Sequence, residues 1–554
     1  MLRFVIDQGG PAGPTRLAHA HAFAADDLPV QADVRFENGE IVIASSSPEP
    51  LGLSLQHPVA RVDDSGEPIA GPPDLLTLQT CLLPPRAGAY GLALELARHR
   101  IMLVLNKLED WQIADLSPDH PAMVMFERAR AAFTDALTRS RHAEERGVLA
   151  HRALAFGLAS SELLAQAAAE RDAETRASGS GYEHAVARYR AIRESDPPPK
   201  APILLPGALG VVLPGRAAIG ATADEPEISE PVRLAVAKSS DFIGLPMRWI
   251  DLEPTEGAYS FARTDAWIEW AVRKARMPIV AGPVIDLRPS SVPEWLYIWE
   301  NDYDTLREMV YEHLRQIVTR YRRTVQTWTV CSGLHTSSNF RMNFDQIMDL
   351  TRICVLVVRK LHPQARVQVE VVQPWGEYHA LSRHSLPPVA YLEMCQQAQL
   401  PIDVIALRVQ TGQPEPGQGA RDPAALAAML DRYAQLEKPI ALSILGAPSA
   451  PSPHEAHDQP ESPAARLAPG RWRSGWTPDS QARWAQEVGR IAATRPYVIS
   501  LCWQQVRDHP GDAGEMPYGG LIDASGAPKP ALAAWASLRT LGAARTPAGT
   551  TTGA

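Results

Sequence analysis

Charged side chains follow several short apolar runs from residue 248 onward. Two carboxyl groups that face one cleft can act as a general acid and as a base or nucleophile. Glu370 or Glu377 would supply one of these groups, and Asp286 or Asp508 the other. Alternatively, the acids pair with neighbouring arginines and fill the cleft as a structural network. The charged and amide residues of this set are Arg248, Asp286, Arg288, Glu370, Glu377, Arg408, Gln410 and Asp508.

Aromatic and imidazole groups accompany these charges. The loop PWGEYHA places Trp375 and Tyr378 on either side of Glu377. Rings that carry a polar handle suit the C–H face of a sugar ring, so this loop is a candidate binding platform. Alternatively, Trp375 caps the hydrophobic core and Glu377 faces solvent. His335 is a candidate general acid near neutral pH, and its alternative role is that of a hydrogen-bonded loop residue.

These residues are positioned by eight short β-branched runs that alternate with helical segments. The pattern predicts a (β/α)8 barrel over residues 201–542, although an open, doubly wound sheet gives the same alternation. In a barrel, function lies at the C-terminal ends of the strands, where these charged residues would meet. The candidate strands are Ala218–Ala221, Phe242–Trp249, Pro278–Val284, Thr327–Val330, Arg366–Val372, Val404–Val409, Ile440–Ile444 and Val498–Trp503.

The first 200 residues have a different texture. Residues 1–78 contain short apolar stretches split by turn residues, which predict a β-sandwich-like domain. Residues 79–180 have long Ala-, Leu-, Arg- and Glu-rich segments at helical spacing, which predict a helical hairpin or bundle. The prolines within 181–200 predict a stiff linker, and residues 543–554 are expected to be a disordered tail. The N-terminal region is also where we expect any homo-oligomer contact.

Motifs within the predicted barrel favour closure over an open sheet. The runs MRWIDLEPTEGAYSF at 247–261 and GGLIDASGAPKPALAAW at 519–535 resemble glycoside hydrolase family 10, the xylanase barrels. The resemblance covers roughly residues 218–541 and implies an eight-stranded barrel with its site at the strand C-termini. It also implies a retaining mechanism, which needs two carboxyl groups about 5–5.5 Å apart. Trp503 falls at the family's substrate-stacking tryptophan on the eighth strand.

Both catalytic glutamates implied by that resemblance are missing. Where the family has WDVVNE on its fourth strand this chain has WTVCSG, so Gly333 stands at the acid/base position. The seventh-strand TELD-like motif corresponds to LSIL, where Ile444 aligns best with the nucleophile. The second-strand lysine is Arg248, and the sixth-strand Gln-x-His is Arg408-Val-Gln410. These coordinated losses predict that the family's xylanase mechanism does not operate.

Composition excludes several classes of protein. The 554 residues carry a net charge of −9 without a basic block, so we expect no nucleic-acid partner. Five cysteines without CxxC spacing indicate a reducing compartment, and MLRFVIDQGG lacks a signal-peptide core, so we expect a cytoplasmic protein. We expect no membrane partner, because no apolar run reaches roughly 18 residues. The pairs His19/His21 and His454/His457 lack a third ligand, so we expect no metal and no cofactor.

Three functions fit these observations. The first is a carbohydrate-binding pseudoenzyme or scaffold of carbohydrate metabolism that takes an oligo- or polysaccharide. The second is an active glycoside hydrolase with carboxylates relocated to Glu370, Glu377 and Asp286. The third is a structural protein whose function lies in the helical segment 87–177. The ligand contacts expected for the first are Arg248, Trp375, Tyr378, Arg408, Gln410, Trp503 and Asp508.

One long insertion interrupts the predicted barrel after its seventh strand. Residues 447–469 are rich in Pro, Ser and His, and Trp472 and Trp476 follow them. Loops longer than about 12–15 residues without secondary structure are often lids or binding loops. The two tryptophans favour a loop that folds over the barrel mouth, whereas the Pro/Ser tract favours mobility.

Overall fold

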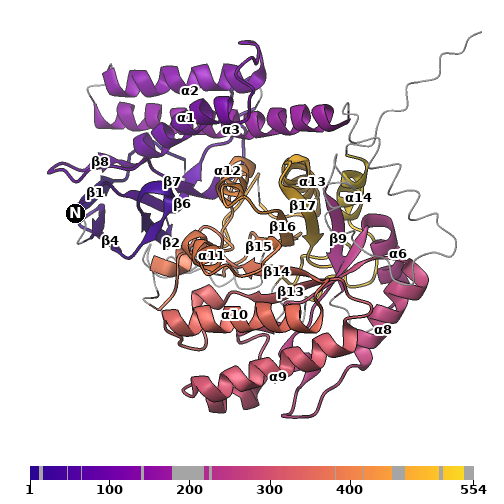
Figure 1. Ribbon diagram of the computed structural model, residues 1–554. Helices are drawn as coiled ribbons and strands as arrows, with labels where there is room; N and C mark the ends of the chain where they lie inside the picture. The colour runs from indigo at the N-terminus through magenta and orange to yellow at the C-terminus, as the bar shows by residue number, and fades with distance from the viewer. Residues whose placement is uncertain are drawn as a thin grey trace, which may run out of the picture.

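The computed structural model contains an N-terminal β region, a helical region and a C-terminal barrel (Figure 1). The predicted linker at 181–200 and the predicted tail at 543–554 lie outside the residues that the structure describes, as does most of the insertion after residue 451. The described residues are 1–11, 16–45, 48–63, 65–138, 142–177, 217–223, 228–380, 382, 384–415, 417–451, 468–473, 475–510 and 516–541.

A closed barrel of parallel strands forms the C-terminal region and confirms the predicted (β/α)8 fold. The strand order is β11-β10-β9-β17-β16-β15-β14-β13-β12, and a β11–β13 pairing closes the ring. Strands β11 and β12 share the third position, because both pair with β13. The strands are β9 (Ala218–Thr222), β10 (Phe242–Leu245), β11 (Ile279–Ala281), β12 (Ile285–Asp286), β13 (Thr327–Ser332), β14 (Arg366–Val371), β15 (Val404–Gln410), β16 (Ile440–Gly446) and β17 (Val498–Trp503).

The barrel strands are apolar because both of their faces are covered. Strand β15, VIALRVQ, is buried at every position, as expected of a parallel strand between a barrel interior and a helical layer. The strand predicted over Phe242–Trp249 is longer than the strand that the structure contains. Strand β10 ends at Leu245, because Pro246 has no N–H to donate to the sheet, and α7 (Trp249–Leu252) forms a helical turn instead.

Helices separate the strands and cover the outside of the barrel (Figure 1). Their starts follow the sequence: α10 begins with a capping box between Asn343 and Gln346, and α12 is capped by Asp422 with proline at its first position. The helices are α6 (Glu230–Ser239), α8 (Ala262–Trp270) with η2 (Ala271–Ala275), η3 (Glu294–Trp299), α9 (Tyr303–Tyr321), η4 (Leu334–Thr336), α10 (Phe344–Leu361), η5 (Glu377–Ala380), α11 (Pro388–Gln397), α12 (Pro423–Ala434), α13 (Pro478–Thr494), α14 (Pro530–Ser537) and η7 (Leu538–Thr540).

Two four-stranded sheets form the N-terminal β region. Their orders are β4-β5-β1-β8 and β3-β2-β6-β7, and every pairing is antiparallel except that of β1 with β8. The final strand lies beyond the predicted boundary at residue 78. The elements are β1 (Leu2–Val5), β2 (Arg16–Phe23), η1 (Ala25–Asp27), β3 (Pro29–Val30), β4 (Asp33–Glu37), β5 (Glu40–Ala44), β6 (Gly52–Val59), β7 (Asp74–Gln79) and β8 (Tyr90–Gly91).

Three helices follow the two sheets: α1 (Leu92–Asp110), α2 (Pro121–Thr138) and α3 (Ala143–Ala177). Helix α3 contacts both of the others, and the three lie side by side at the top of Figure 1. By length and composition alone, Ala143–Glu174 could cross a membrane, in contrast to the expectation from the sequence. However, 67% of its most apolar window is buried inside the protein, as in the core helix of a helical bundle.

The N-terminal regions are docked onto the barrel. Helix α3 contacts α12 and α13, and Leu75 and Arg471 exchange two main-chain hydrogen bonds of 2.9 Å. In α1, Arg100 forms a bidentate pair with Asp422, at N–O distances of 2.9 and 2.5 Å. The side chains of this pair are 3% and 0% exposed, so a charged contact lies inside the junction.

Candidate functional site

A cavity of about 330 Å³ opens at the C-terminal ends of the barrel strands. All eight strand positions contribute to its wall. Phe242 is the only phenyl or indole ring among the described lining residues, so the wall is built mainly from polar and small side chains. Representative residues, in strand order, are Thr222, Gly244, Gly282 with Asp286, Thr329, Glu370 with Gln368, Arg408, Ser443 and Cys502.

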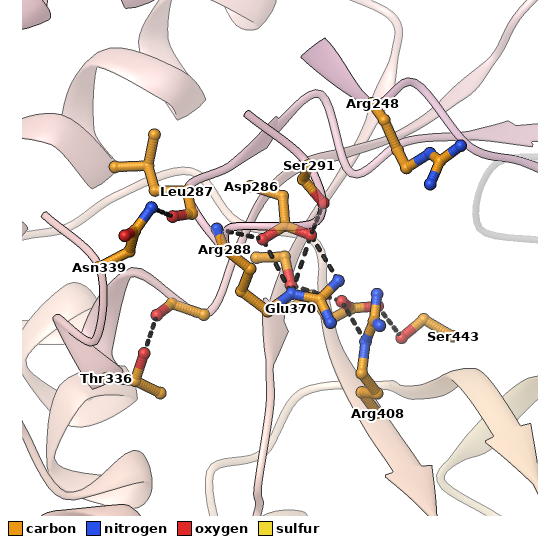
Figure 2. A network of polar contacts seen from close by, with 12 residues as sticks. Arg248, Asp286, Leu287, Arg288, Ser291, Thr336, Asn339, Glu370, Arg408 and Ser443 are labelled. Carbon is orange, nitrogen blue, oxygen red and sulfur yellow. Dashed lines mark hydrogen bonds and ion pairs between the residues drawn. The ribbon is translucent and has the colours of Figure 1, made fainter. Parts of the chain in front are cut away.

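Glu370 lines this cavity near the end of β14 and is 1% exposed. Its Oε1 accepts hydrogen bonds from Ser332 Oγ at 2.6 Å and from Arg408 Nε at 3.2 Å. Its Oε2 accepts from Ser443 Oγ at 2.5 Å (Figure 2). Each carboxylate oxygen of Glu370 therefore already accepts at least one hydrogen bond.

Asp286 is the second carboxylate of the cavity wall and ends β12. Arg288 contacts it through Nε at 3.0 Å from each oxygen and through Nη2 at 2.5 Å from Oδ2. The Arg288 main-chain N–H and the Ser291 hydroxyl donate as well, at 3.1 and 2.9 Å. Figure 2 shows this pair beside Glu370 and Arg408. Both acids thus occur as arginine-held carboxylates, which is the ion-pair network considered from the sequence.

Two further arginines line the outer part of the cavity. Arg248 follows β10 and Arg263 belongs to α8. Both contact Asp251, with Arg248 Nε at 2.8 Å and Arg263 Nη1 at 3.7 Å from Oδ2. Their side chains are 44% and 34% exposed. They form a partly exposed rim, and in Figure 2 the Arg248 guanidinium stands apart from the inner cluster.

The two positions of the implied family catalysts carry no carboxylate in the structure. Gly333 has φ +64°, and a Cβ at this position would lie 3.1 Å from Val372 Cγ2. Its conformation and surroundings therefore favour glycine. Ile444 lines the cavity, but the hydroxyl of its neighbour Ser443 is the group that contacts Glu370. Hydroxyls from Ser332 and Ser443, each next to one of these positions, converge on Glu370.

His335 lies behind the cavity wall and not in it. It is fully buried, its ring stacks on Tyr391 at 5.2 Å, and its Nε2 lies 3.1 Å from the Val372 carbonyl oxygen. Burial lowers the pKa of His335 to about 4, so the imidazole is neutral at pH 7. We expected a candidate general acid, but the structure gives His335 the alternative role of a hydrogen-bonded loop residue.

The predicted aromatic platform faces the N-terminal sheet instead of the cavity. Glu377 is buried in η5, where Arg421 Nη2 lies 2.5 Å from Oε1. The Arg421 guanidinium also covers the Trp375 ring at 4.4 Å. Burial raises the pKa of Glu377, but the charges of Arg421 and His21 outweigh it and leave that pKa lowered. Neither Glu377 nor Tyr378, which is also buried, lines the cavity.

Trp503 is a core residue at the end of β17. It is fully buried, its Nε1 donates to the Gly519 carbonyl at 2.9 Å, and its ring contacts Trp484 and Trp535. No surface of it lines the cavity. The stacking role implied by the resemblance is therefore not available in this arrangement, because neighbouring tryptophans cover the ring.

Two other predicted ligand contacts lie just outside the cavity. Asp508 forms a buried pair with Lys529 Nζ at 2.9 and 3.0 Å. Gln410 donates from Nε2 to Gln504 Oε1 at 3.0 Å, and Gln504 lines the cavity. Gln410 can therefore orient a lining amide without touching a ligand itself.

The described end of the insertion packs against the N-terminal regions. Trp472 is fully buried, and its Nε1 donates to Glu162 of α3 at 3.1 Å. Trp476 is also buried and donates to the Gly470 carbonyl at 3.2 Å. Neither ring lines the cavity. We expected these tryptophans to cover the barrel mouth, but they instead anchor the end of the loop to the protein core.

Sequence reasoning missed several residues of the cavity wall. Gln368 precedes Glu370 by two positions on β14, so strand alternation would have placed both on one face. Ser443 was overlooked because its neighbour Ile444, and not Ser443, aligns with the family's nucleophile position. Arg263 lies in a helix, where nothing in its local pattern indicates a cavity.

Within the part of the chain that the structure describes, no group of three His, Cys, Asp or Glu residues is arranged to hold a metal. Of the two histidine pairs, His21 is buried. The side chain of His19 and both residues His454 and His457 lie outside the described set.

Comparison with known proteins identifies a family that part of this chain matches. Residues 242–445 match the model of glycosyl hydrolase family 10, which confirms the resemblance seen in the motifs. An endo-1,4-beta-xylanase from Agaricus bisporus is 26% identical over 121 residues, which are 21% of this chain and 35% of that protein. The chain thus spans about a third of the length of that relative.

Solved structures of similar fold include xylanase B from Clostridium stercorarium F9, at 15% identity and a TM-score of 0.44. That match covers 59% of this chain and 98% of the other. A family 10 protein from Paenibacillus barcinonensis matches at 18% identity and a TM-score of 0.43, over 59% of this chain and 95% of the other.

Proposed function

We propose that the barrel, whose residues 242–445 match glycosyl hydrolase family 10, binds a saccharide in its mouth cavity without hydrolysing it. One observation carries this proposal. Asp286 and Glu370, the two carboxylates among the described lining residues, are each held by an arginine and by serine hydroxyls. The positions of the family's catalytic glutamates are Gly333 and Ile444.

The arrangement of Glu370 argues against a catalytic role. A nucleophile needs a carboxylate oxygen directed at the sugar carbon, and a general acid needs a proton directed at the leaving oxygen. Both Glu370 oxygens instead accept hydrogen bonds from neighbouring side chains of the barrel. Three donors therefore already occupy most of the roughly four lone-pair positions of this carboxylate.

The wall is suited to recognition of a hydroxylated ligand. Hydroxyl, amide and guanidinium groups converge on one cavity, and a few placed polar groups give a binding site its specificity. The family match supports a sugar as the ligand class. We expected aromatic stacking from Trp375, Tyr378 and Trp503, but none of these rings lines the cavity. In the proposed complex the protein therefore recognises the sugar through hydrogen bonds.

The second candidate function is hydrolysis with relocated carboxylates, now limited to Asp286 and Glu370. It keeps one observation in its favour, namely that both acids line the same cavity. Glu377 no longer contributes to it, because Glu377 pairs with Arg421 away from the cavity.

The test combines binding and turnover on the purified full chain. Calorimetric titration with neutral and acidic oligosaccharides is run beside hydrolysis assays of the same sugars and of aryl glycosides. We expect binding without turnover, and weaker binding in Glu370→Gln. The control is Glu312→Gln, an exposed glutamate held by Arg315 outside the cavity, which should leave binding unchanged. Turnover that disappears in Glu370→Gln would replace this proposal with the relocated mechanism.

A further inference from the structure

An apolar groove lies between helices α9 and α10 on the outside of the barrel (Figure 1). Its volume is about 720 Å³, and among the described residues it shares none with the cavity at the barrel mouth. Met309, Ile353 and Val357 are its more buried apolar residues, and Tyr311 and Leu356 stand beside them at 44% and 45% exposed. Exposed apolar patches of this kind often mark surfaces that bind another protein.

Large exposed apolar side chains are concentrated on these two helices. In the described part of the barrel region there are five such side chains, and three of them belong to α9 or α10. Covering them is favourable, because apolar surface is then removed from water. The five are Leu234, Ile298, Tyr311, Phe344 and Leu356.

The two helices run in the same direction and lie level with each other. Near their starts, Arg307 Nε of α9 lies 2.9 Å from Asp349 Oδ2 of α10. At their ends, Arg322 Nη1 donates to the Leu361 carbonyl oxygen at 3.0 Å. Because a helix rises about 1.5 Å per residue, residues just after Arg307 and just after Asp349 lie within about one turn of each other along the groove.

Opposite charges flank the groove. The α9 side carries Glu308, and the α10 side carries Arg352 and Lys360. All three side chains are exposed, and none of them has an ion pair or a hydrogen bond with the residues that the structure describes. Glu308 and Arg352 stand at nearly the same level, one and three residues after the Arg307–Asp349 contact. The other acids of the groove are already paired within the chain, Asp349 with Arg307 and Glu312 with Arg315.

We propose that the α9–α10 groove is the contact between two copies of this chain, related by a two-fold axis that runs along the groove. A half-turn about this axis places α9 of each copy opposite α10 of the other and keeps every residue at its own level. Glu308 therefore faces Arg352 of the partner subunit, and the contact occurs twice, as in any isologous interface. The exposed Tyr311 and Leu356 side chains are covered in the same step.

This proposal is independent of the saccharide ligand. It also moves the homo-oligomer contact to the barrel, whereas the sequence led us to expect it in the N-terminal region. The contact face is about 27 Å long, because α10 has 18 residues. A two-helix face is at the small end of specific protein interfaces, so we expect a dimer with a Kd on the order of micromolar.

The test is sedimentation velocity of the full chain over about a hundredfold range of concentration centred on the micromolar range. We expect monomer at the low end and dimer at the high end. Leu356→Ser should weaken the dimer about tenfold or more, because it removes apolar surface from both halves of the contact. Its control is Leu234→Ser on α6, which is 63% exposed and lies outside the groove, and which should leave the dimer unchanged.

Charge reversal tests the two-fold arrangement itself. Glu308→Arg and Arg352→Glu should each weaken the dimer about tenfold or more, because each places two pairs of like charges across the interface. An equal mixture of the two variants should dimerise again, since both contacts then join opposite charges. The control is Glu393→Arg on α11, an exposed glutamate outside the groove, which should have no effect.

Three results would overturn the proposal. The first is a monomer at every concentration. The second is a dimer that neither charge reversal weakens, which would place the contact elsewhere, for example in the N-terminal region. The third is a mixture of Glu308→Arg and Arg352→Glu that stays monomeric although both variants melt at the wild-type temperature. Should one variant fail to fold, the double variant Glu308→Arg/Arg352→Glu replaces the mixture, because its two copies again meet with opposite charges.

Discussion

The buried pair between Arg100 and Asp422 gives a quantitative test of how the N-terminal helices hold the barrel. Its guanidinium and carboxylate meet at 2.9 and 2.5 Å, and both side chains are almost completely excluded from solvent. Asp422 also caps α12, where it accepts the Ala425 N–H at 3.1 Å. Replacing Arg100 with methionine fills a similar volume but leaves the Asp422 charge without its partner.

The expected cost follows from burial. Removing one partner of a buried ion pair destabilises a protein by about 3–5 kcal/mol, because the remaining charge is left uncompensated. Arg100→Met should lower the free energy of unfolding by this amount. The double variant Arg100→Met/Asp422→Asn removes both charges, and asparagine still caps a helix. It should therefore regain about half of the loss.

Urea unfolding followed by circular dichroism and tryptophan fluorescence measures both effects. The control is Arg35→Met, in an exposed pair with Asp33 whose side chains are 47% and 59% exposed; exposed pairs contribute less than about 1 kcal/mol. If Arg100→Met cost no more than Arg35→Met, the buried pair would not hold the junction, and this reasoning would be wrong.

Three further predictions concern single positions. Gly333→Ala should lower the free energy of unfolding by about 1–3 kcal/mol in thermal unfolding, because φ +64° is strained for alanine and the new Cβ would meet Val372. The control is Gly39→Ala, at φ +82° in open space. It measures the backbone strain alone and should cost less. Burial raises the pKa of Asp74 to about 7, so Asp74 destabilises the fold progressively as pH rises from its unfolded pKa of about 4 through 7. Asp74→Asn should therefore gain stability relative to wild type between pH 5 and 8, on the order of 2 kcal/mol; a constant difference across this range would contradict the burial argument. Trp503→Phe should lower the melting temperature but leave saccharide affinity unchanged in calorimetry, and a specific loss of affinity would restore the stacking role.

The barrel was predictable from sequence because its signals are local. In helix α10 (Phe344–Leu361) the apolar residues recur at helical spacing, which the sequence alone displays. Asp286, Glu370, Arg248 and Arg408 meet in one cavity, because residues at the C-terminal ends of barrel strands converge wherever the barrel closes.

The errors have long-range causes. Glu377 and Trp375 directly follow the sequence of β14, but the N-terminal sheet docks beside them and Arg421 pairs with Glu377. Trp503 lies at a strand end like Glu370, yet two other tryptophans cover it. Local periodicity carries no information about which distant element packs against a given residue.

The most direct test of binding without hydrolysis is a search for products after prolonged incubation. Acidic and neutral oligosaccharides are mixed with a high concentration of wild-type chain, and mass spectrometry resolves the saccharides that remain. If the barrel binds saccharides without hydrolysing them, every oligosaccharide is recovered at its original length, while calorimetry on the same material detects binding. Shortened products that form with wild type and are absent with Glu370→Gln would contradict it and make this barrel a glycosidase with relocated carboxylates.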